Sequence, residues 1–343
     1  MRLIACIEEP DVAKKILGNA HQMRVTFAVS VLAACLASAC AAPSRDDGDE
    51  GVVDDTADDT VADTGPCPAP PDGVVLEETG PFVPSDDPAA RDAGDGTVVL
   101  MGGGAEVDRA SRLFVDGAHG GEVLVLRASG STSSYTGYFA EELDVARPAR
   151  AVATVRIDDP ARGADKSVLC RVRRAEALWL AGGDQRDYLL RSPAALHEAI
   201  AARIAAGAAV GGTSAGAMSL GEMAFDARNG GVTSDEALSD SGAALVSVTP
   251  SPFGTVADVV VDTHFSARDR EGRLLAFVAK AGDGVRGVGL DEGTALVISG
   301  DQAAVLADDG GAFVYEASGV SVDDGLDIER LVRRALGDGE AVA

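Results

Sequence analysis

Apolar and polar positions alternate in blocks along most of the chain, and six short apolar runs stand out. These runs are rich in β-branched residues and span residues 97–101, 122–126, 151–157, 175–181, 208–210 and 256–261. Continuous apolar runs of this length are typical of parallel strands that are buried on both faces. We therefore predict that these runs are strands of one buried sheet.

Segments with a helical period lie between and after these runs. The segment 194–206 follows Ser192-Pro193, which is a favourable cap and first-turn pair, and 267–281 has the same period. Residues 217–225 also suit a helix. Strands that alternate with helices predict an α/β fold with a doubly wound, mostly parallel sheet.

The last part of the chain changes to short strands separated by Gly and Asp. We expect these strands at residues 285–290, 294–299, 302–306 and 312–316. They predict a short antiparallel extension, followed by a final helix over 327–336. Because the sequence contains no internal repeat, we expect one domain over residues 75–343.

The first 40 residues predict a leader. Met23-Arg24 gives a short basic start, and the apolar segment that follows has about 15 residues, too short for a comfortable membrane span. Small residues precede Cys35 and Cys40, as in the lipobox of bacterial lipoproteins. We expect lipidation at Cys40, with Cys35 or an ordinary cleaved signal as alternatives, and Met23 as a candidate true start. The protein is then exported, as a cell-envelope lipoprotein or an extracellular protein, and touches membrane through the lipid anchor alone.

Residues 41–74 predict an acidic tether that contains prolines. Between Arg45 and Thr64 nine residues are acidic and one is basic, so this stretch repels itself and stays extended. The whole chain has 55 acidic residues against 29 Lys and Arg, a formal net charge of -26. This surplus argues against a nucleic-acid partner. The 46% of hydrophobic residues is enough to bury a sizeable core.

Cys67 and Cys170 are the cysteines that lie after the leader. In an oxidising compartment they could pair. The sequence does not give the separation of their Cα atoms, which a disulfide restricts, so the pairing stays open.

The segment Gly212-Thr213-Ser214-Ala215-Gly216 fits the G-x-S-x-G pattern of a nucleophile elbow. It follows a predicted strand and precedes a predicted helix, as the elbow requires. The glycines permit a sharp turn that exposes the Ser214 hydroxyl, and the Ala215 amide is a candidate donor to an oxyanion. A flexible turn with an incidental serine is the alternative.

A serine nucleophile needs a base and a carboxylate that orients the base. The histidines are at positions 21, 119, 197 and 264. His264 directly follows a buried strand, so we take it as the base. Asp262, Asp291 and Glu292 lie at strand ends as candidates for the carboxylate, and we prefer Glu292.

Gly182-Gly183-Asp184-Gln185 ends the strand before the elbow strand, and Gly183 is a candidate second oxyanion donor. Because no nucleotide motif and no metal-spaced cluster is present, we expect no cofactor and no metal.

Three arginines follow His264 closely: Arg268, Arg270 and Arg273. They could clamp carboxylates of a substrate. Alternatively, they form a solvated helix face in which Asp269 and Glu271 are their local partners.

These motifs resemble the cyanophycinase family of serine peptidases, peptidase family S51, which is related to the aspartyl dipeptidase peptidase E. The resemblance covers about residues 95–320, and its blocks occur in the family's order at 182–185, 212–217, 262–274 and 289–295. It implies a class I glutamine amidotransferase-like (flavodoxin-like) fold. It also implies hydrolysis of cyanophycin, a poly-aspartate that carries arginine on each β-carboxyl, to β-aspartyl-arginine dipeptides.

The resemblance further implies that Ser214 is the nucleophile, His264 the base and Glu292 the third member. The residues that it places in the pocket are Gln185, Asp262, Arg268, Arg270 and Arg273. The expected partner is a peptide or cyanophycin-like polymer, and relatives suggest a homodimer. Thr263 stands where the family commonly has Gln, which leaves the exact substrate open. A peptidase E-like dipeptidase and a non-catalytic binding lipoprotein are the alternatives.

Overall fold

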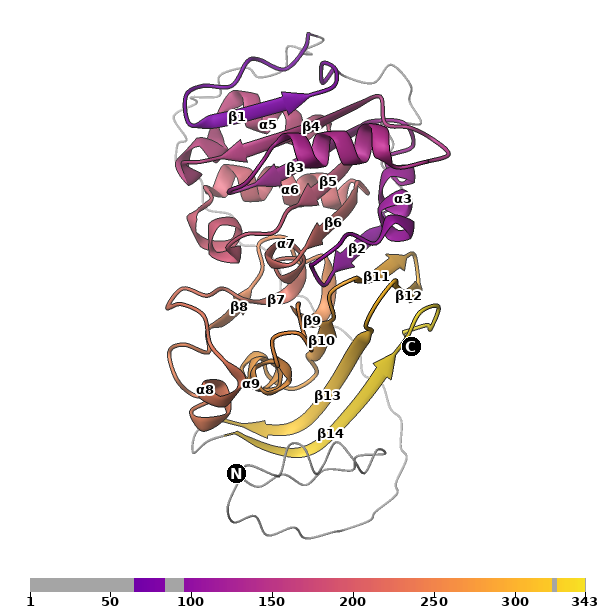
Figure 1. Cartoon of the computed structure of the whole chain (residues 1–343). Helices are drawn as coiled ribbons and strands as arrows, with labels where there is room; N and C mark the ends of the chain where they lie inside the picture. Colours follow the sequence, from indigo (N-terminus) through magenta and orange to yellow (C-terminus); the bar gives the residue numbers. More distant parts are fainter. Residues whose placement is uncertain (1–64, 84–95, 323–325, 343) are drawn as a thin grey trace, which may run out of the picture.

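The computed structural model describes residues 65–83, 96–322 and 326–342. Its strands form two sheets, of eight and six strands, in place of the single extended sheet that the sequence predicts. The eight-stranded sheet fills the upper half of the molecule in Figure 1, and the six-stranded sheet fills the lower half. The coarse expectation of a mixed α/β fold is confirmed.

The eight-stranded sheet contains five of the six predicted apolar runs. Its strands are β1 (Val74–Glu78), β2 (Val98–Met101), β3 (Glu122–Arg127), β4 (Ala151–Ile157), β5 (Ala177–Leu180), β6 (Ala209–Thr213), β11 (Thr294–Ser299) and β12 (Gln302–Ala307). The order is β1-β4-β3-β5-β6-β2-β11-β12, and β4, β3, β5, β6 and β2 are parallel. The loops after these parallel strands therefore lie together at the carboxyl ends of the strands, where ligands of α/β sheets bind.

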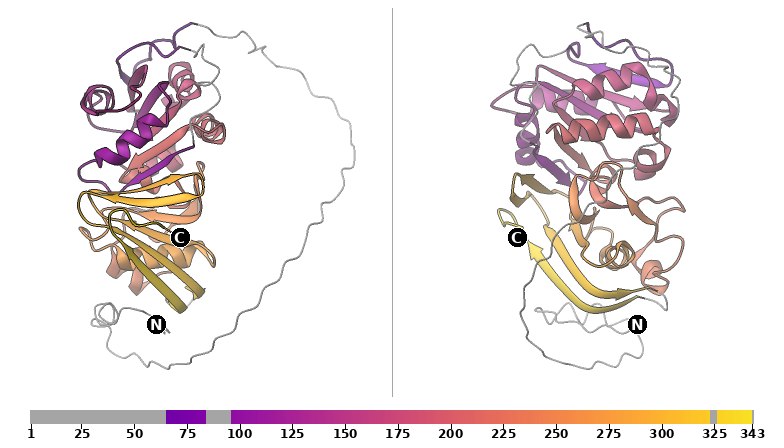
Figure 2. Two further views of the ribbon diagram at one scale, coloured as in Figure 1. Left: turned by 90° about the vertical axis from the view of Figure 1, so that its right-hand side faces the viewer. Right: turned by 180° about the vertical axis from the view of Figure 1, so that it is seen from behind.

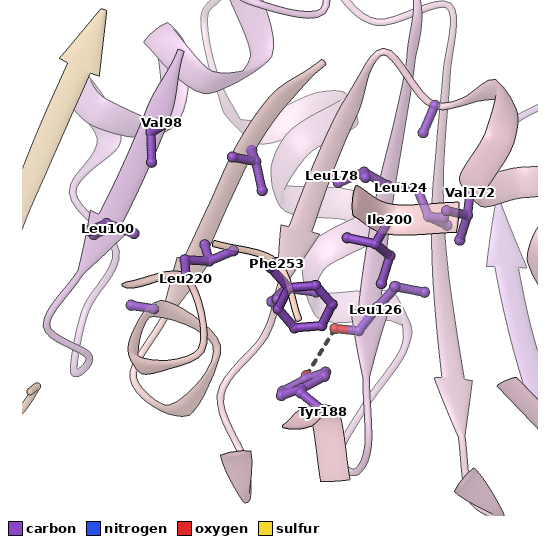
Figure 3. Close-up of a cluster of buried hydrophobic side chains, with 14 of the residues drawn as sticks. Val98, Leu100, Leu124, Leu126, Val172, Leu178, Tyr188, Ile200, Leu220 and Phe253 are labelled. Carbon is purple, nitrogen blue, oxygen red and sulfur yellow. Dashed lines mark hydrogen bonds between the residues drawn. The ribbon is translucent and has the colours of Figure 1, made fainter. Parts of the chain in front are cut away.

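Helices pack on both faces of the eight-stranded sheet, as the two views in Figure 2 show. Successive residues of a strand point to opposite faces, and β3 places Leu124 and Leu126 in one core and Val123 and Val125 in another. The helices α5 (Lys166–Arg174) and α6 (Ala194–Ala205) cover the first face. In Figure 3 this core includes Tyr188, whose hydroxyl donates to the Leu126 carbonyl at 3.1 Å.

The second face is covered by α3 (Asp108–Asp116) and the short helical segment η1 (Tyr138–Glu142). Phe114 and Phe139 pack there against Trp179, with ring centroids 5.0 and 5.5 Å apart. Three more short helical segments lie in this half: α4 (Ser133–Gly137), η2 (Pro160–Ala164) and η3 (Asp187–Arg191).

The six-stranded sheet packs against a helix of its own. Its strands are β7 (Gly221–Phe225), β8 (Val248–Pro250), β9 (Val256–Asp262), β10 (Arg286–Leu290), β13 (Ala312–Ser321) and β14 (Asp327–Leu336), in the order β14-β13-β10-β9-β7-β8. The helix α9 (Glu271–Ala281) lies inside the curve of β13 and β14, next to α8 (Ser234–Ser239) (Figure 1). Within the described residues, no helix is both long enough and apolar enough to cross a membrane.

Two helix predictions are wrong. Residues 327–336 form the strand β14, which pairs antiparallel with β13 along its whole length and buries Ile328 and Leu331. This pairing overrides the local preference of the segment for a helix. Residues 217–225 are not one helix, because α7 (Ala215–Met218) ends early and β7 starts at Gly221. The helix expected over 267–281 begins at Glu271.

The strap Gly65–Val83 lies against the eight-stranded sheet, so residues 66–71 are not the free spacer that we expected. A disulfide joins Cys67 to Cys170 on α5, with Cα atoms 5.7 Å apart, which answers the question that the sequence left open. Arg171 contacts the strap as well, because it donates to the Pro68 carbonyl at 3.0 Å. β1 then extends the sheet by pairing antiparallel with β4.

Candidate active site

Ser214 lies at the tip of the turn that joins β6 to α7. Its φ is 52°, a left-handed conformation that residues other than glycine rarely adopt. Gly216 makes this turn possible, because a Cβ there would lie 1.9 Å from the Leu180 carbonyl oxygen. The backbone of α7 therefore packs directly on β5, and Ser214 lies at the edge where the parallel strands end. This is the geometry of a nucleophile elbow.

Two consecutive hydrogen bonds connect Ser214 to His264 and His264 to Glu292. Ser214 Oγ lies 2.7 Å from His264 Nε2, and His264 Nδ1 lies 2.6 Å from Glu292 Oε1. A carboxylate accepts hydrogen bonds, so we assign the imidazole proton to Nδ1, which donates to Glu292. Nε2 is then free to accept the proton of the serine hydroxyl.

The three residues come from different parts of the fold. Ser214 follows β6 of the eight-stranded sheet, and His264 follows β9 of the six-stranded sheet. Glu292 lies on the turn between β10 and β11, where the chain passes from one sheet to the other. The site therefore lies at the junction of the two sheets.

The triglycine segment, residues 102–104 after β2, packs directly against the histidine and the glutamate. A Cβ at Gly103 would lie 2.4 Å from His264 Cε1, and one at Gly104 would lie 2.9 Å from the Cβ of Glu292. The first carbonyl of the segment also accepts a hydrogen bond from the His264 amide at 2.7 Å. No role for this segment was expected from the sequence. Its signal was three glycines at the end of a parallel strand, at the edge that carries the elbow.

Asp291, one of the two other candidate carboxylates, has a structural role. It accepts hydrogen bonds from the amides of Ser266 and Gly311, at 2.8 and 3.2 Å. These bonds fix the start of the segment after His264 and the turn before β13. Asp291 therefore supports the loops around the site without contacting the imidazole.

Asp262, the other candidate, holds two arginines. Arg273 donates to both of its carboxylate oxygens, at 2.7 and 2.6 Å, and Arg270 Nη1 lies 3.3 Å from Oδ1. Asp262 is fully buried and does not line the cavity beside Ser214, contrary to expectation. Since one carboxylate serves two guanidinium groups, a surplus of positive charge remains in front of it.

A cavity of about 310 Å³ opens beside Ser214. Its lining includes Gly183, Gln185, Ser214, Ala215, Arg268, Arg270 and Arg273. The Gln185 side chain donates to the Phe225 carbonyl at 3.2 Å, which fixes it at the cavity wall. The structure thus brings the expected arginines and Gln185 together with the serine.

Glu271 does not pair with the three arginines, as the solvated-face alternative required. It accepts hydrogen bonds from the Tyr315 hydroxyl at 2.6 Å and from Arg333 at 3.1 Å, and it does not line the cavity beside Ser214. The position of the arginines in the cavity wall therefore favours the clamp over the solvated helix face.

Gly183 and Ala215, the candidate oxyanion donors, flank Ser214. A Cβ at Gly182 would lie 3.5 Å from the Cβ of Ser214, so the end of β5 runs beside the serine. Gly183 has a φ of 152°, which favours glycine. Ala215 is the first residue of α7, and amides in the first turn of a helix lack an intrahelical acceptor.

The environment keeps His264 neutral. Burial lowers the pKa of its imidazole below the usual value, and the charges of Arg268 and Arg270 act in the same direction, while the hydrogen bond to Glu292 opposes them. The same hydrogen bond lowers the pKa of Glu292, which stays ionised. A neutral imidazole beside an ionised carboxylate is the state that a general base needs.

Thr263, between Asp262 and His264 in the sequence, does not line the cavity. It is fully buried, and its hydroxyl has no hydrogen-bond partner among the described residues.

In residues 65–83, 96–322 and 326–342, no three His, Cys, Asp or Glu side chains are grouped as metal ligands would be. Cys35 and Cys40 lie outside the described residues.

Residues 123–306 match the family model of peptidase family S51, which is more than half of the chain. The chain belongs to peptidase family S51. Members are serine peptidases, so this S51 peptidase is a serine-type hydrolase.

Two cyanophycinases are similar in sequence. The S51 peptidase is 31% identical over 202 residues to "Cyanophycinase" from Geminocystis herdmanii, covering 56% of this chain and 71% of the relative. It is 29% identical over 205 residues to the cyanophycinase of Synechococcus elongatus, covering 56% of this chain and 60% of that protein. The crystal structure of a peptidase from an acI-B1 actinobacterium has the same fold, with a TM-score of 0.52, 17% identity, and coverage of 74% of this chain and 98% of that one.

Proposed function

We propose that this S51 peptidase is an exopeptidase that hydrolyses cyanophycin, or a closely similar aspartyl polymer, to β-aspartyl-arginine dipeptides. The observation that carries the proposal is the hydrogen-bonded series Ser214, His264 and Glu292 at the mouth of a cavity lined by arginines. The two cyanophycinase relatives support the substrate class.

In the proposed reaction, Ser214 Oγ forms a bond to the carbonyl carbon of the scissile amide, and its proton passes to His264 Nε2. Glu292 accepts the hydrogen bond from Nδ1 and stabilises the imidazolium. The negative charge that develops on the carbonyl oxygen meets the amides of Gly183 and Ala215.

The carbon–nitrogen bond then breaks, and His264 returns the proton to the leaving amine. The acyl group stays on Ser214 as an ester. A water molecule gives its proton to His264 and attacks the ester carbon, which releases the acid and restores the serine hydroxyl.

The arginine cluster suits the carboxylates of an aspartyl substrate. Asp262 neutralises one of the two guanidinium groups that it contacts, so Arg268 and Arg270 offer charge to a ligand in the cavity. Guanidinium groups bind carboxylates through paired, charge-assisted hydrogen bonds. The net charge of -26 over the whole chain is complementary to the arginine side chains of the polymer.

The test is incubation of the purified protein with cyanophycin and, separately, with aspartyl dipeptides, followed by mass spectrometry of the products. We expect β-aspartyl-arginine from the polymer. Release from dipeptides but not from the polymer would indicate the peptidase E-like specificity. No release from either substrate by folded protein would contradict both, and would leave a binding lipoprotein with a peptidase fold.

We further infer that the eight-stranded sheet is the doubly wound core of a class I glutamine amidotransferase-like fold. Five parallel strands with helices on both faces support this assignment. An experimental structure in which the helices after β2 and β3 lie on one face with α5 and α6 would contradict it.

We also propose export and a lipid anchor at Cys40. The leader pattern supports the proposal, and the Cys67–Cys170 disulfide is of the kind that forms in oxidising compartments. Fractionation of cells that produce the protein tests it. Cys40→Ser should move the protein from the membrane to the soluble fraction, whereas the same shift with Cys35→Ser instead would assign the lipid to Cys35.

A further inference from the structure

A serine-rich loop lies beside Gly183, which borders the arginine cavity. This β3 loop, residues 128–132 between β3 and α4, follows β3, which neighbours β5 in the sheet. Ser129 Oγ lies 3.8 Å from the position that a Cβ at Gly183 would occupy. Gly182, one residue earlier, borders Ser214. The β3 loop is therefore next to the candidate oxyanion donor, yet none of its residues lines the arginine cavity.

Two guanidinium groups hold three consecutive carbonyl groups of the β3 loop. Arg127 Nε donates to Ser129 O at 2.8 Å, and its Nη1 donates to Ser131 O at 2.6 Å. Arg156 Nη1 donates to Gly130 O at 3.0 Å. The backbone acceptors of the loop are thus turned toward the two arginines, which are register partners on the adjacent strands β3 and β4.

The glycine of the loop is required by this arrangement. Gly130 has a φ of 90°, and a Cβ there would lie 2.5 Å from Arg127 Nη2. A side chain at this position would displace the guanidinium group. The close approach indicates that the loop conformation depends on Arg127.

The outward side of the β3 loop offers hydrogen-bond donors. Ser129 and Ser131 are exposed, and the amides of Ser129, Gly130 and Ser131 have no acceptor among the described residues. Arg127 forms no salt bridge within the described part of the chain; its guanidinium lies over the Tyr135 ring, 5.3 Å from the centroid, and its charge opposes the rise that burial causes in the pKa of Glu106. Arg156 is paired with Asp158, at 2.7 Å. Donors backed by an unpaired positive charge favour an anionic ligand.

We propose that the β3 loop is a second substrate-binding subsite, which binds a carboxylate on the leaving-group side of the scissile bond. The Ser129 hydroxyl and the loop amides would contact that carboxylate. Arg127 and Arg156 act as positioning residues that hold the loop. The inference rests on the proposed function, since it assigns one end of the substrate to the arginine cavity and the other to the β3 loop.

The experiment compares two substrates that differ at one group. The first is a two-unit fragment of the polymer with its free backbone-terminal carboxylate, and the second is the same fragment with that carboxylate amidated. We expect the wild-type KM for the free acid to be about tenfold lower, because charge-assisted hydrogen bonds to one carboxylate are lost in the amide.

Two variants distinguish a residue that contacts the carboxylate from one that positions the loop. Ser129→Ala removes the hydroxyl but keeps the carbonyl that Arg127 holds, so it should raise KM for the free acid severalfold at unchanged kcat. Arg127→Met should remove the whole preference for the acid. Arg147→Met is the matched control, because Arg147 is exposed before β4, at the opposite edge of the sheet. It should behave as wild type with both substrates.

Equal KM values for the two substrates in the wild-type enzyme would overturn the inference. An equal rise for both substrates in Ser129→Ala would overturn it as well, because the loop would then have no carboxylate preference. If Arg127→Met lowers the melting temperature, Ser129→Ala still decides, since it leaves the loop scaffold intact. No hydrolysis of either fragment by folded wild-type protein would instead contradict the proposed function, and the inference with it.

Discussion

The two sheets contribute to the site in different ways. The eight-stranded sheet supplies Ser214, Gly183 and the triglycine segment 102–104, which act through the backbone at tight strand ends. The six-stranded sheet supplies His264 and the arginine cluster around Asp262, which act through charge. Glu292 lies on the turn that joins the two sheets.

This division separates position from protonation. Glycines at the first set of strand ends bring groups closer than any side chain allows, so changes there should alter kcat through geometry. Charged groups in the second set determine the protonation state of His264 and the ligand charge that the site binds, so changes there should alter pH profiles and KM. Substitutions at each set of strand ends test this distinction.

Ser214→Ala should lower turnover by about 10⁴- to 10⁶-fold, because the attacking oxygen is lost. The melting temperature should change by less than about 2 °C, since Ser214 Oγ makes one hydrogen bond within the described residues, to His264. Steady-state kinetics and thermal unfolding provide the measurements. Ser239→Ala on the exposed helix α8 is the control and should retain full activity. Residual full activity of Ser214→Ala would remove this serine from the mechanism.

Glu292→Gln should lower kcat by about 10²- to 10⁴-fold, because an amide can hold the wrong imidazole tautomer. Asp291→Asn is its matched neighbour. That change weakens two backbone hydrogen bonds, so it should reduce the free energy of unfolding by about 1–3 kcal/mol and spare most of kcat. If Asp291→Asn lowers kcat as much as Glu292→Gln does, the observed hydrogen bond does not identify the carboxylate that orients His264.

Gly103→Ala should lower kcat by about 10- to 100-fold, because the new Cβ would displace the His264 ring and a misplaced catalytic group costs rate. Gly96→Ala controls for backbone strain. Gly96 also has a positive φ, 68°, yet a Cβ there would have nothing within 4 Å. Both variants should lose stability, and Gly103→Ala alone should lose turnover. Equal kcat values in the two variants would show that the triglycine segment does not position His264.

Arg268→Gln should shift the acid limb of kcat/KM to higher pH. The positive charge of Arg268 lowers the pKa of His264, so its removal raises that pKa and leaves less of the neutral base at a given acidic pH. The effect should be a few-fold loss at pH 6 and should shrink in high salt. Arg147→Gln, at the far edge of the sheet, should leave the limb in place. An acid limb that moves to lower pH would contradict the assignment of His264 as the titrating base.

The buried strands and the nucleophile elbow could be predicted from the sequence, because each depends on a local pattern. Continuous apolar runs give β3, β4 and β5 close to their observed bounds, and the glycines beside Ser214 indicate the turn. The pairing of strands is not local. The chain therefore divides into two sheets without a signal in the periodicity, and residues 327–336 look helical until β13 is available to pair with them.

Part of the site depended on contacts between distant segments. Whether Asp262, Asp291 or Glu292 faces His264 is decided by where two sheets meet, and no spacing in the sequence encodes that. The triglycine segment is recognisable in the sequence, but its role depends on His264, more than a hundred residues later, which packs on it. Asp262 resembles a pocket residue in sequence because it precedes His264 closely, yet it lies behind the arginines that it holds.

The disulfide between Cys67 and Cys170 also determines how mechanical load passes through the chain. It bridges a sequence separation of 103 residues, which includes β1, β2, β3 and β4. A pull on the chain before Gly65 reaches α5 directly through the sulfur bridge. The first four strands lie in the loop that the bridge closes and so outside the covalent path of that pull, whereas β5 and β6, which lead to Ser214, follow Cys170 and lie on it.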